Sequence, residues 1–124
     1  MKLYRIHLVL GLVWLLIGMT LGQIMGESGD HGQLPTHAHI MLVGGVLSLA
    51  WGLLYRVLNL PARLIAGIQT LAHHLGSVCM VVALYMLYGS MGEPASVSVF
   101  IGLGGVAVML SALLMLLLVI RAKD

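Results

Sequence analysis

Four long apolar runs constrain this chain more than any other feature of its sequence. They extend over residues 4–25, 36–58, 62–91 and 95–120 and take up almost all of the 124 residues. A bilayer core about 30 Å thick needs about 20 apolar residues for each helical crossing, so each run is long enough to span a membrane. The chain is 60% hydrophobic and 8% charged, which leaves no room for a soluble domain. We therefore predict an all-α, integral membrane four-helix bundle that forms one domain over residues 1–124.

The charged residues divide between the two sides of these predicted crossings. All six lysine and arginine residues flank one side, whereas Glu27, Asp30 and Glu93 lie in the two connections on the other side. The positive-inside rule then predicts cytoplasmic N and C termini for a multi-pass protein of a bacterial-type inner membrane. The net charge of +2 follows from this topology and indicates no nucleic-acid partner. The first run exceeds the length of a signal-peptide h-region and lacks an Ala-x-Ala-like cleavage site, so we expect a retained helix.

Two histidines, His37 and His39, stand where a polar loop gives way to the second run. Pro35 and Thr36 directly before them are typical of a helix start. At about 100° per residue, rings two positions apart point about 200° apart on a regular helix. The two imidazoles therefore enter different grooves. Small residues follow His37 at helical spacing and leave a slot for either a neighbouring helix or a planar macrocycle.

A second pair, His73 and His74, lies inside the third run. At about 1.5 Å per residue this pair is near the middle of the membrane, where ionisable side chains are functional candidates. The alternative is that neutral rings form hydrogen bonds to Ser48, to Thr70 or to a backbone carbonyl. His7 lies near the cytoplasmic end of the first run, where it could reach the lipid headgroups, and is a lesser candidate.

Three functions for the histidines remain open from the residues alone. Neutral imidazoles in an apolar bundle suit axial ligation of b-type heme. A copper or zinc site could form in the outer loop from His37 and His39 with His31, and His73 and His74 could line a transporter pathway. A fourth reading is a structural subunit whose histidines only form hydrogen bonds. No phosphate loop, nucleophile elbow or carboxylate pair is present, so no enzyme class is indicated.

The second run also resembles part of a known family. The residues that carry the resemblance are Thr36-His37-Ala38-His39-Ile40 with Gly44, followed by Trp51-Gly52 and Tyr55. They look like the small membrane proteins related to the catalytic subunit I of heme-copper oxidases. That subunit consists of three pseudo-symmetric arcs of four helices, and the second helix of the third arc carries a His-x-His whose two rings ligate different hemes.

The resemblance implies that His37 and His39 hold heme b between subunits. One arc in place of three can rebuild the oxidase arrangement only as a homo-oligomer, most naturally a trimer. The implied function is electron transfer or heme and gas sensing, with a quinol or a cytochrome as redox partner. The family also has a His-His copper pair on the third helix of an arc, which His73 and His74 resemble. The cross-linked tyrosine and proton channels of the oxidases have no counterpart here, so a complete oxidase is not expected.

Overall fold

A computed structural model describes residues 2–60 and 64–122. Within these ranges every regular element is helical and no strand occurs. The elements in chain order are α1 (Leu3–Ser28), α2 (Leu34–His39), the π-helical segment η1 (Ile40–Leu47), α3 (Ser48–Val57), α4 (Leu64–Tyr88) and α5 (Pro94–Ile120).

Because α2, η1 and α3 follow one another without a break, they form one continuous helix over Leu34–Val57. The described residues thus contain four helices that are long and apolar enough to cross a membrane. This confirms the prediction of an all-α bundle, and its pattern is that of a multi-pass membrane protein. The helix bounds agree with the apolar runs to within a few residues, while the predicted start of the third helix at residue 62 lies outside the described residues.

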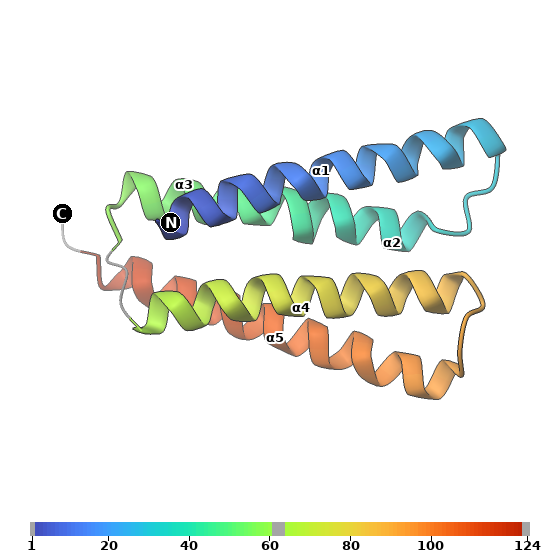
Figure 1. Cartoon of the computed structure of the whole chain (residues 1–124). Coiled ribbons are helices and arrows are strands. Elements are labelled where there is room, and N and C mark those ends of the chain that lie inside the picture. The colour runs from blue at the N-terminus through green and yellow to red at the C-terminus, as the bar shows by residue number, and fades with distance from the viewer. Residues whose placement is uncertain (1, 61–63, 123–124) are drawn as a thin grey trace.

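The four helices pair as two hairpins, one made of α1 and the α2–α3 helix and the other of α4 and α5 (Figure 1). The start of α1 and the end of α5 lie at the same end of the bundle (Figure 1). We call this end, which carries Lys2, Arg5 and Arg56, the basic end. The opposite end carries Glu27 near the end of α1 and the loops with Asp30 and Glu93, and is called the acidic end.

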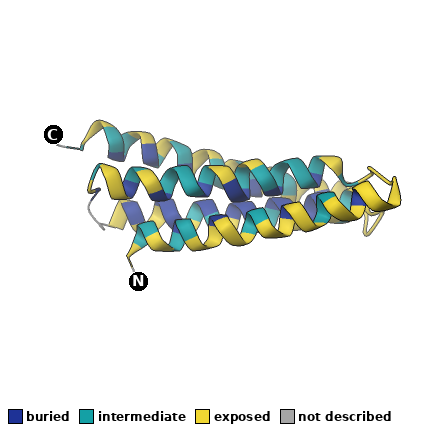
Figure 2. Ribbon diagram, turned by 90° about the horizontal axis from the view of Figure 1, so that it is seen from above, coloured by how far each residue is buried: buried dark blue, intermediate teal, exposed yellow. Residues whose placement is uncertain are grey.

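The hydrophobic core that joins the two hairpins lies toward the basic end. Tyr55, Leu60 and Ala66 pack there with Met115 and Leu118 from α5. Buried residues face the interior along the bundle, whereas exposed residues cover the outer faces and the loops of the acidic end (Figure 2). Many of the exposed side chains are leucine, valine and isoleucine. Such a surface is favourable against lipid and unfavourable against water.

Glycines allow α4 and α5 to approach with their backbones in contact. A Cβ atom on Gly104 would lie 2.7 Å from the carbonyl oxygen of Gly76, and one on Gly76 would lie 2.9 Å from the carbonyl oxygen of Gly104. Close approach through small residues is the usual way in which helices associate in lipid. The contact holds α5 closely against α4.

The second helix widens directly after His39. Residues Ile40–Leu47 are π-helical, so their backbone hydrogen bonds enclose wider turns than those of an α-helix. A regular α-helix was predicted here. The side-chain directions predicted at about 100° per residue from His39 therefore do not apply beyond Ile40. Beyond the wide turns, Ser48 and Trp51 both face α4 and contact His73.

Candidate functional site

Three histidines from α1 and α4 meet inside the bundle. His7 and His73 are fully buried, and His74 is partly buried beside them. The ring centroids of His7 and His74 are 4.7 Å apart, and those of His73 and His74 are 5.0 Å apart. One potential ligand nitrogen from each ring lies within 4.8 Å of the other two. We call these three residues the histidine cluster.

A network of neutral polar groups orients His7. Its Nε2–H donates to Gln69 Oε1 at 3.3 Å and to Thr70 Oγ1 at 3.1 Å. Gln69 is itself oriented because its Nε2 donates to Ser111 Oγ of α5 at 3.0 Å, while its Oε1 accepts from Tyr55 at 2.9 Å. The amide oxygen of Gln69 therefore faces His7. The Nδ1 atom on the opposite edge of His7 is buried and has no hydrogen-bond partner.

Both ring nitrogens of His73 form hydrogen bonds with residues of α3. The indole Nε1–H of Trp51 donates to His73 Nδ1 at 3.3 Å, and His73 Nε2 lies 2.8 Å from Ser48 Oγ. The structure thus contains the hydrogen bond to Ser48 that the sequence analysis offered as the alternative to a functional role. This outcome applies to His73 alone, because its neighbour His74 has no hydrogen-bond partner.

His74 has two buried ring nitrogens, and neither has a hydrogen-bond partner. Leaving a buried polar atom unpaired costs about 1–3 kcal/mol, and this residue carries two such atoms. With His7 Nδ1, three unpartnered nitrogens gather in one cluster. Chemically, the cluster offers lone pairs of neutral imidazoles in an apolar surrounding, which is a donor set suited to zinc, copper, iron and nickel.

The spacing of the cluster also suits a metal ion. With metal–nitrogen distances of about 2.0–2.1 Å, nitrogens on opposite sides of an ion lie about 4 Å apart. One nitrogen from each ring of the cluster lies within 4.8 Å of the other two, which is close to that separation. A porphyrin cannot lie among these rings, because their centroids are separated by only 4.7–5.7 Å.

The predicted pair His37 and His39 lies near the acidic end, and its rings do turn to different surroundings. His37 donates from Nδ1 to the carbonyl oxygen of Gly18 on α1 at 2.9 Å, whereas His39 donates from Nδ1 to Pro35 in its own helix at 2.8 Å. The slot behind His37 is filled by α1, since a Cβ atom on Gly44 would lie 2.6 Å from the ring of Trp14 and one on Gly52 would lie 2.9 Å from Leu8. The neighbouring helix, and not a macrocycle, occupies this groove in the chain.

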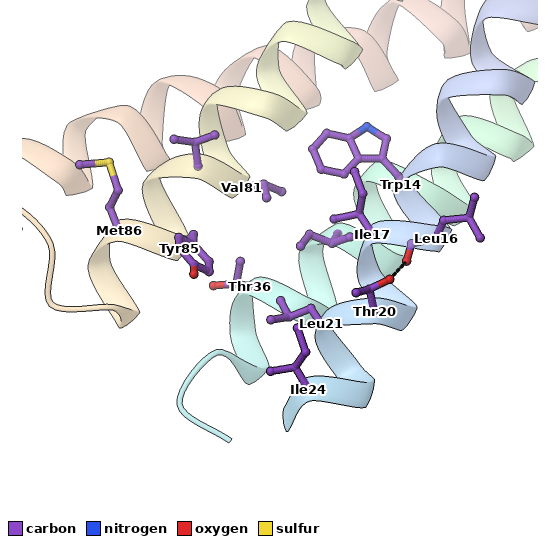
Figure 3. A pocket seen from close by; sticks show the side chains of 12 residues that line it. Trp14, Leu16, Ile17, Thr20, Leu21, Ile24, Thr36, Val81, Tyr85 and Met86 are labelled. Atoms are coloured by element: carbon purple, nitrogen blue, oxygen red, sulfur yellow. Dashed lines mark hydrogen bonds between the residues drawn. The ribbon is translucent and has the colours of Figure 1, made fainter. Parts of the chain in front are cut away.

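A cavity of about 530 Å³ opens between α1, α2 and α4 in the half of the bundle near the acidic end. Figure 3 shows Thr36 of α2 and Tyr85 of α4 on its walls, with Trp14 of α1 above them. Neither His37 nor His39 lines this cavity.

His31, the residue of the alternative outer copper or zinc site, lies in the loop after α1. It is exposed there, and its Nδ1 donates to the carbonyl oxygen of Gly29 at 3.0 Å. Among the described residues, the group of three potential metal ligands that the structure brings together is the histidine cluster.

His7 was a lesser candidate from the sequence, and Gln69 and Ser111 were not predicted to belong to the site. His7 could have reached the headgroups, but it is buried in the core, where it forms hydrogen bonds with Gln69 and Thr70 and stacks on Tyr55. A signal for this arrangement is present in the third run. Its buried polar residues recur at intervals of three and four positions, namely Gln69, Thr70, His73 and Ser77. This spacing describes a polar stripe on one face of a membrane helix, for which partners on other helices are required.

Comparisons with known proteins found no relative. No protein-family model matches the chain, and no curated protein or solved structure is significantly similar to it.

Proposed function

We propose that this protein binds a transition-metal ion inside the membrane through the histidine cluster. The observation that supports the proposal is the set of buried ring nitrogens on His7 and His74 that lack hydrogen-bond partners. Buried polar atoms in proteins are nearly always paired, so unpaired ring nitrogens on two neighbouring histidines indicate a ligand. Neutral imidazole nitrogens bind transition metals through the lone pairs that are left unpaired here.

The ring nitrogens of a purely structural histidine would form hydrogen bonds with other groups of the protein. His73 meets this description, because Trp51 and Ser48 occupy both of its nitrogens. His74 does not, and replacing its ring with an apolar side chain would remove the cost of two unpaired atoms. The presence of histidine at this position is therefore better explained by ligand binding than by packing.

Equilibrium metal binding to the purified protein in lipid nanodiscs tests the proposal. After chelator treatment, we expect one equivalent of Cu(I), Zn(II) or Co(II) to bind. Because the loss of an outer-shell partner alone typically costs 10–100-fold, we expect His7→Gln and His74→Gln to lower the affinity by at least about 100-fold. His31→Gln, in the exposed loop, is the matched control and should bind as the unaltered protein does. Equal binding by the His74→Gln variant and the unaltered protein would overturn the proposal.

A second function, heme b binding by His37 and His39, is favoured by a different observation. Both residues donate Nδ1–H to a backbone carbonyl. A carbonyl oxygen only accepts, so the lone pair of each neutral ring lies on Nε2. Metal-ligating histidines commonly have this arrangement. We propose that the heme lies between copies of the chain in a homo-oligomer, with a trimer favoured, because the cavity within one chain is lined by neither histidine.

In this second function the bound heme would serve electron transfer or the sensing of heme or a gas, with a quinol or a cytochrome as redox partner. A visible spectrum of the purified protein tests it. We expect a Soret band and sharp α and β bands on reduction, and loss of this spectrum in His37→Ala and His39→Ala. The same change at His7 should leave the spectrum in place. A colourless protein that heme cannot reconstitute, or a monomeric mass for the pigmented protein, contradicts the assignment.

We propose further that the basic end faces the cytoplasm of a bacterial-type cell, with the chain in the inner membrane and both termini inside. The distribution of Lys2, Arg5 and Arg56 against Glu27 and Asp30 supports this orientation. A reporter fused to the C-terminus should be active if it functions only in the cytoplasm and inactive if it functions only outside. The reverse pattern would invert the topology.

A further inference from the structure

We infer that the proposed metal centre is a two-ligand site for a monovalent ion, with His7 and His74 as ligands. The hydrogen bond from Trp51 keeps His73 from binding the ion. The inference rests on the proposed function and specifies which atoms bind and which class of ion they select. The bound ion is a soft monovalent d¹⁰ cation, namely Cu(I), for which Ag(I) is an air-stable probe.

The neighbours of His7 determine which of its nitrogens can bind. The Oε1 atom of Gln69 only accepts hydrogen bonds, so His7 must carry its proton on Nε2 to donate to it. The lone pair of the neutral ring then lies on Nδ1, which is buried and unpartnered. A metal ion in the cluster therefore binds to His7 through Nδ1.

The neighbours of His73 leave it no lone pair to offer. An indole N–H is only a donor, so the contact from Trp51 uses the lone pair on His73 Nδ1. The neutral ring then carries its proton on Nε2 and donates it to Ser48 Oγ. His73 becomes a metal ligand only if the bond to Trp51 breaks. Until then His7 and His74 supply the two available lone pairs.

The charge of the surroundings selects among ions. The group of potential ligands contains histidines without a carboxylate or a thiolate. Glu27, Asp30 and Glu93 lie at the acidic end, whereas His7 lies near the opposite end of α1. The bound ion thus keeps its full charge in an apolar core. The desolvation cost of an ion rises with the square of its charge, so a divalent ion is penalised far more than a monovalent one. Low coordination is also usual for Cu(I) and Ag(I), whereas Zn(II) takes four ligands.

The experiment compares Ag(I) and Zn(II) binding to the full-length protein in nanodiscs by competition with a chelator of known affinity. We expect Ag(I) to bind with little change in His73→Gln, whose amide can still donate to Ser48 and accept from Trp51. His7→Gln and His74→Gln should each lose at least about 100-fold in Ag(I) affinity. In Trp51→Phe, His73 Nδ1 is released as a third ligand, so Zn(II) affinity should rise by about tenfold or more while Ag(I) affinity stays close to that of the unaltered protein.

The outcomes separate this inference from the proposed function. Binding of no metal at all, or binding insensitive to His7 and His74, overturns both. Zn(II) binding as tight as Ag(I), with His73→Gln as harmful as His74→Gln, overturns the inference and leaves a three-histidine metal site in place. A Trp51→Phe variant that gains no Zn(II) affinity, although its circular dichroism spectrum is unaltered, would show that Trp51 does not keep His73 from binding the metal.

Discussion

The histidine cluster and the pair of His37 and His39 use their nitrogens in opposite ways. In the cluster, three ring nitrogens of His7 and His74 are buried without a partner. In the pair, each Nδ1 is bonded to a backbone carbonyl. The cluster brings His7 of α1 beside residues of α4 that are more than sixty positions away in the chain, whereas the pair belongs to a single helical turn. A motif in one helix fixes which side chains are present, but the folding of several helices decides which of them are left without partners.

The comparison predicts opposite stability effects for the same substitution in the two groups. His74→Leu removes two unpaired buried nitrogens, so we expect it to stabilise the metal-free protein by about 1–3 kcal/mol. His37→Leu removes the bond to the carbonyl oxygen of Gly18 and should destabilise the protein by about 0.5–1.5 kcal/mol. Denaturation of both metal-free variants in the same detergent measures the difference. A destabilised His74→Leu variant would show that the ring has a structural partner and would remove the main support for the metal proposal.

A smaller effect is expected from the residue that orients His7. Gln69→Leu leaves Thr70 as the partner of His7 Nε2, and the Thr70 hydroxyl accepts from it because it donates its own proton to the carbonyl oxygen of Ala66 at 2.9 Å. His7 then loses one of the two groups that orient its ring, so metal affinity should fall by about 10–100-fold. Gln69→Glu keeps an accepting oxygen in place and adds a negative charge, so it should restore binding and favour Zn(II) more than the unaltered protein does. Heme binding by His37 and His39 should not change in either variant.

The fold was largely predictable from the sequence because each helix is specified locally. Runs of apolar residues with Pro35 and Pro94 at helix starts define the crossings, and the structure places the helices within a few residues of those runs. The π-helical segment after His39 was not predicted, because nothing in the local sequence distinguishes it from an α-helix; within it, Gly44 and Gly45 lie against Trp14 and Leu15 of α1.

The candidate site was predictable only in part. The adjacent pair His73 and His74 was identified from its depth in the membrane, and the hydrogen bond to Ser48 was among the alternatives. The participation of His7 was not predicted, because it depends on the alignment of α1 against α4, and no pattern within α1 specifies that alignment. Ser111 was overlooked for the same reason, as one hydroxyl in a run of apolar residues gains its role only through contact with Gln69.

The smallest predicted effect concerns Gly22, which faces His37, with Gly26 as its control. A Cβ atom on Gly22 would lie 2.9 Å from His37 Cε1, whereas one on Gly26, a turn later in α1, would meet nothing within 4 Å. The half-buried His37 ring can shift by a few tenths of an ångström, so Gly22→Ala should cost at most about 1 kcal/mol of stability, and Gly26→Ala should cost less. If His37 ligates heme, Gly22→Ala should also shift the reduced α band, because the added methyl group rotates the ring and strains its hydrogen bond to the carbonyl oxygen of Gly18.

Binding of Ag(I) at the histidine cluster should be equal in both variants, since the Cβ atom on Gly22 would meet His37, which does not belong to that cluster. A Gly22→Ala variant that alters Ag(I) binding would mean that the two histidine groups are coupled through α1.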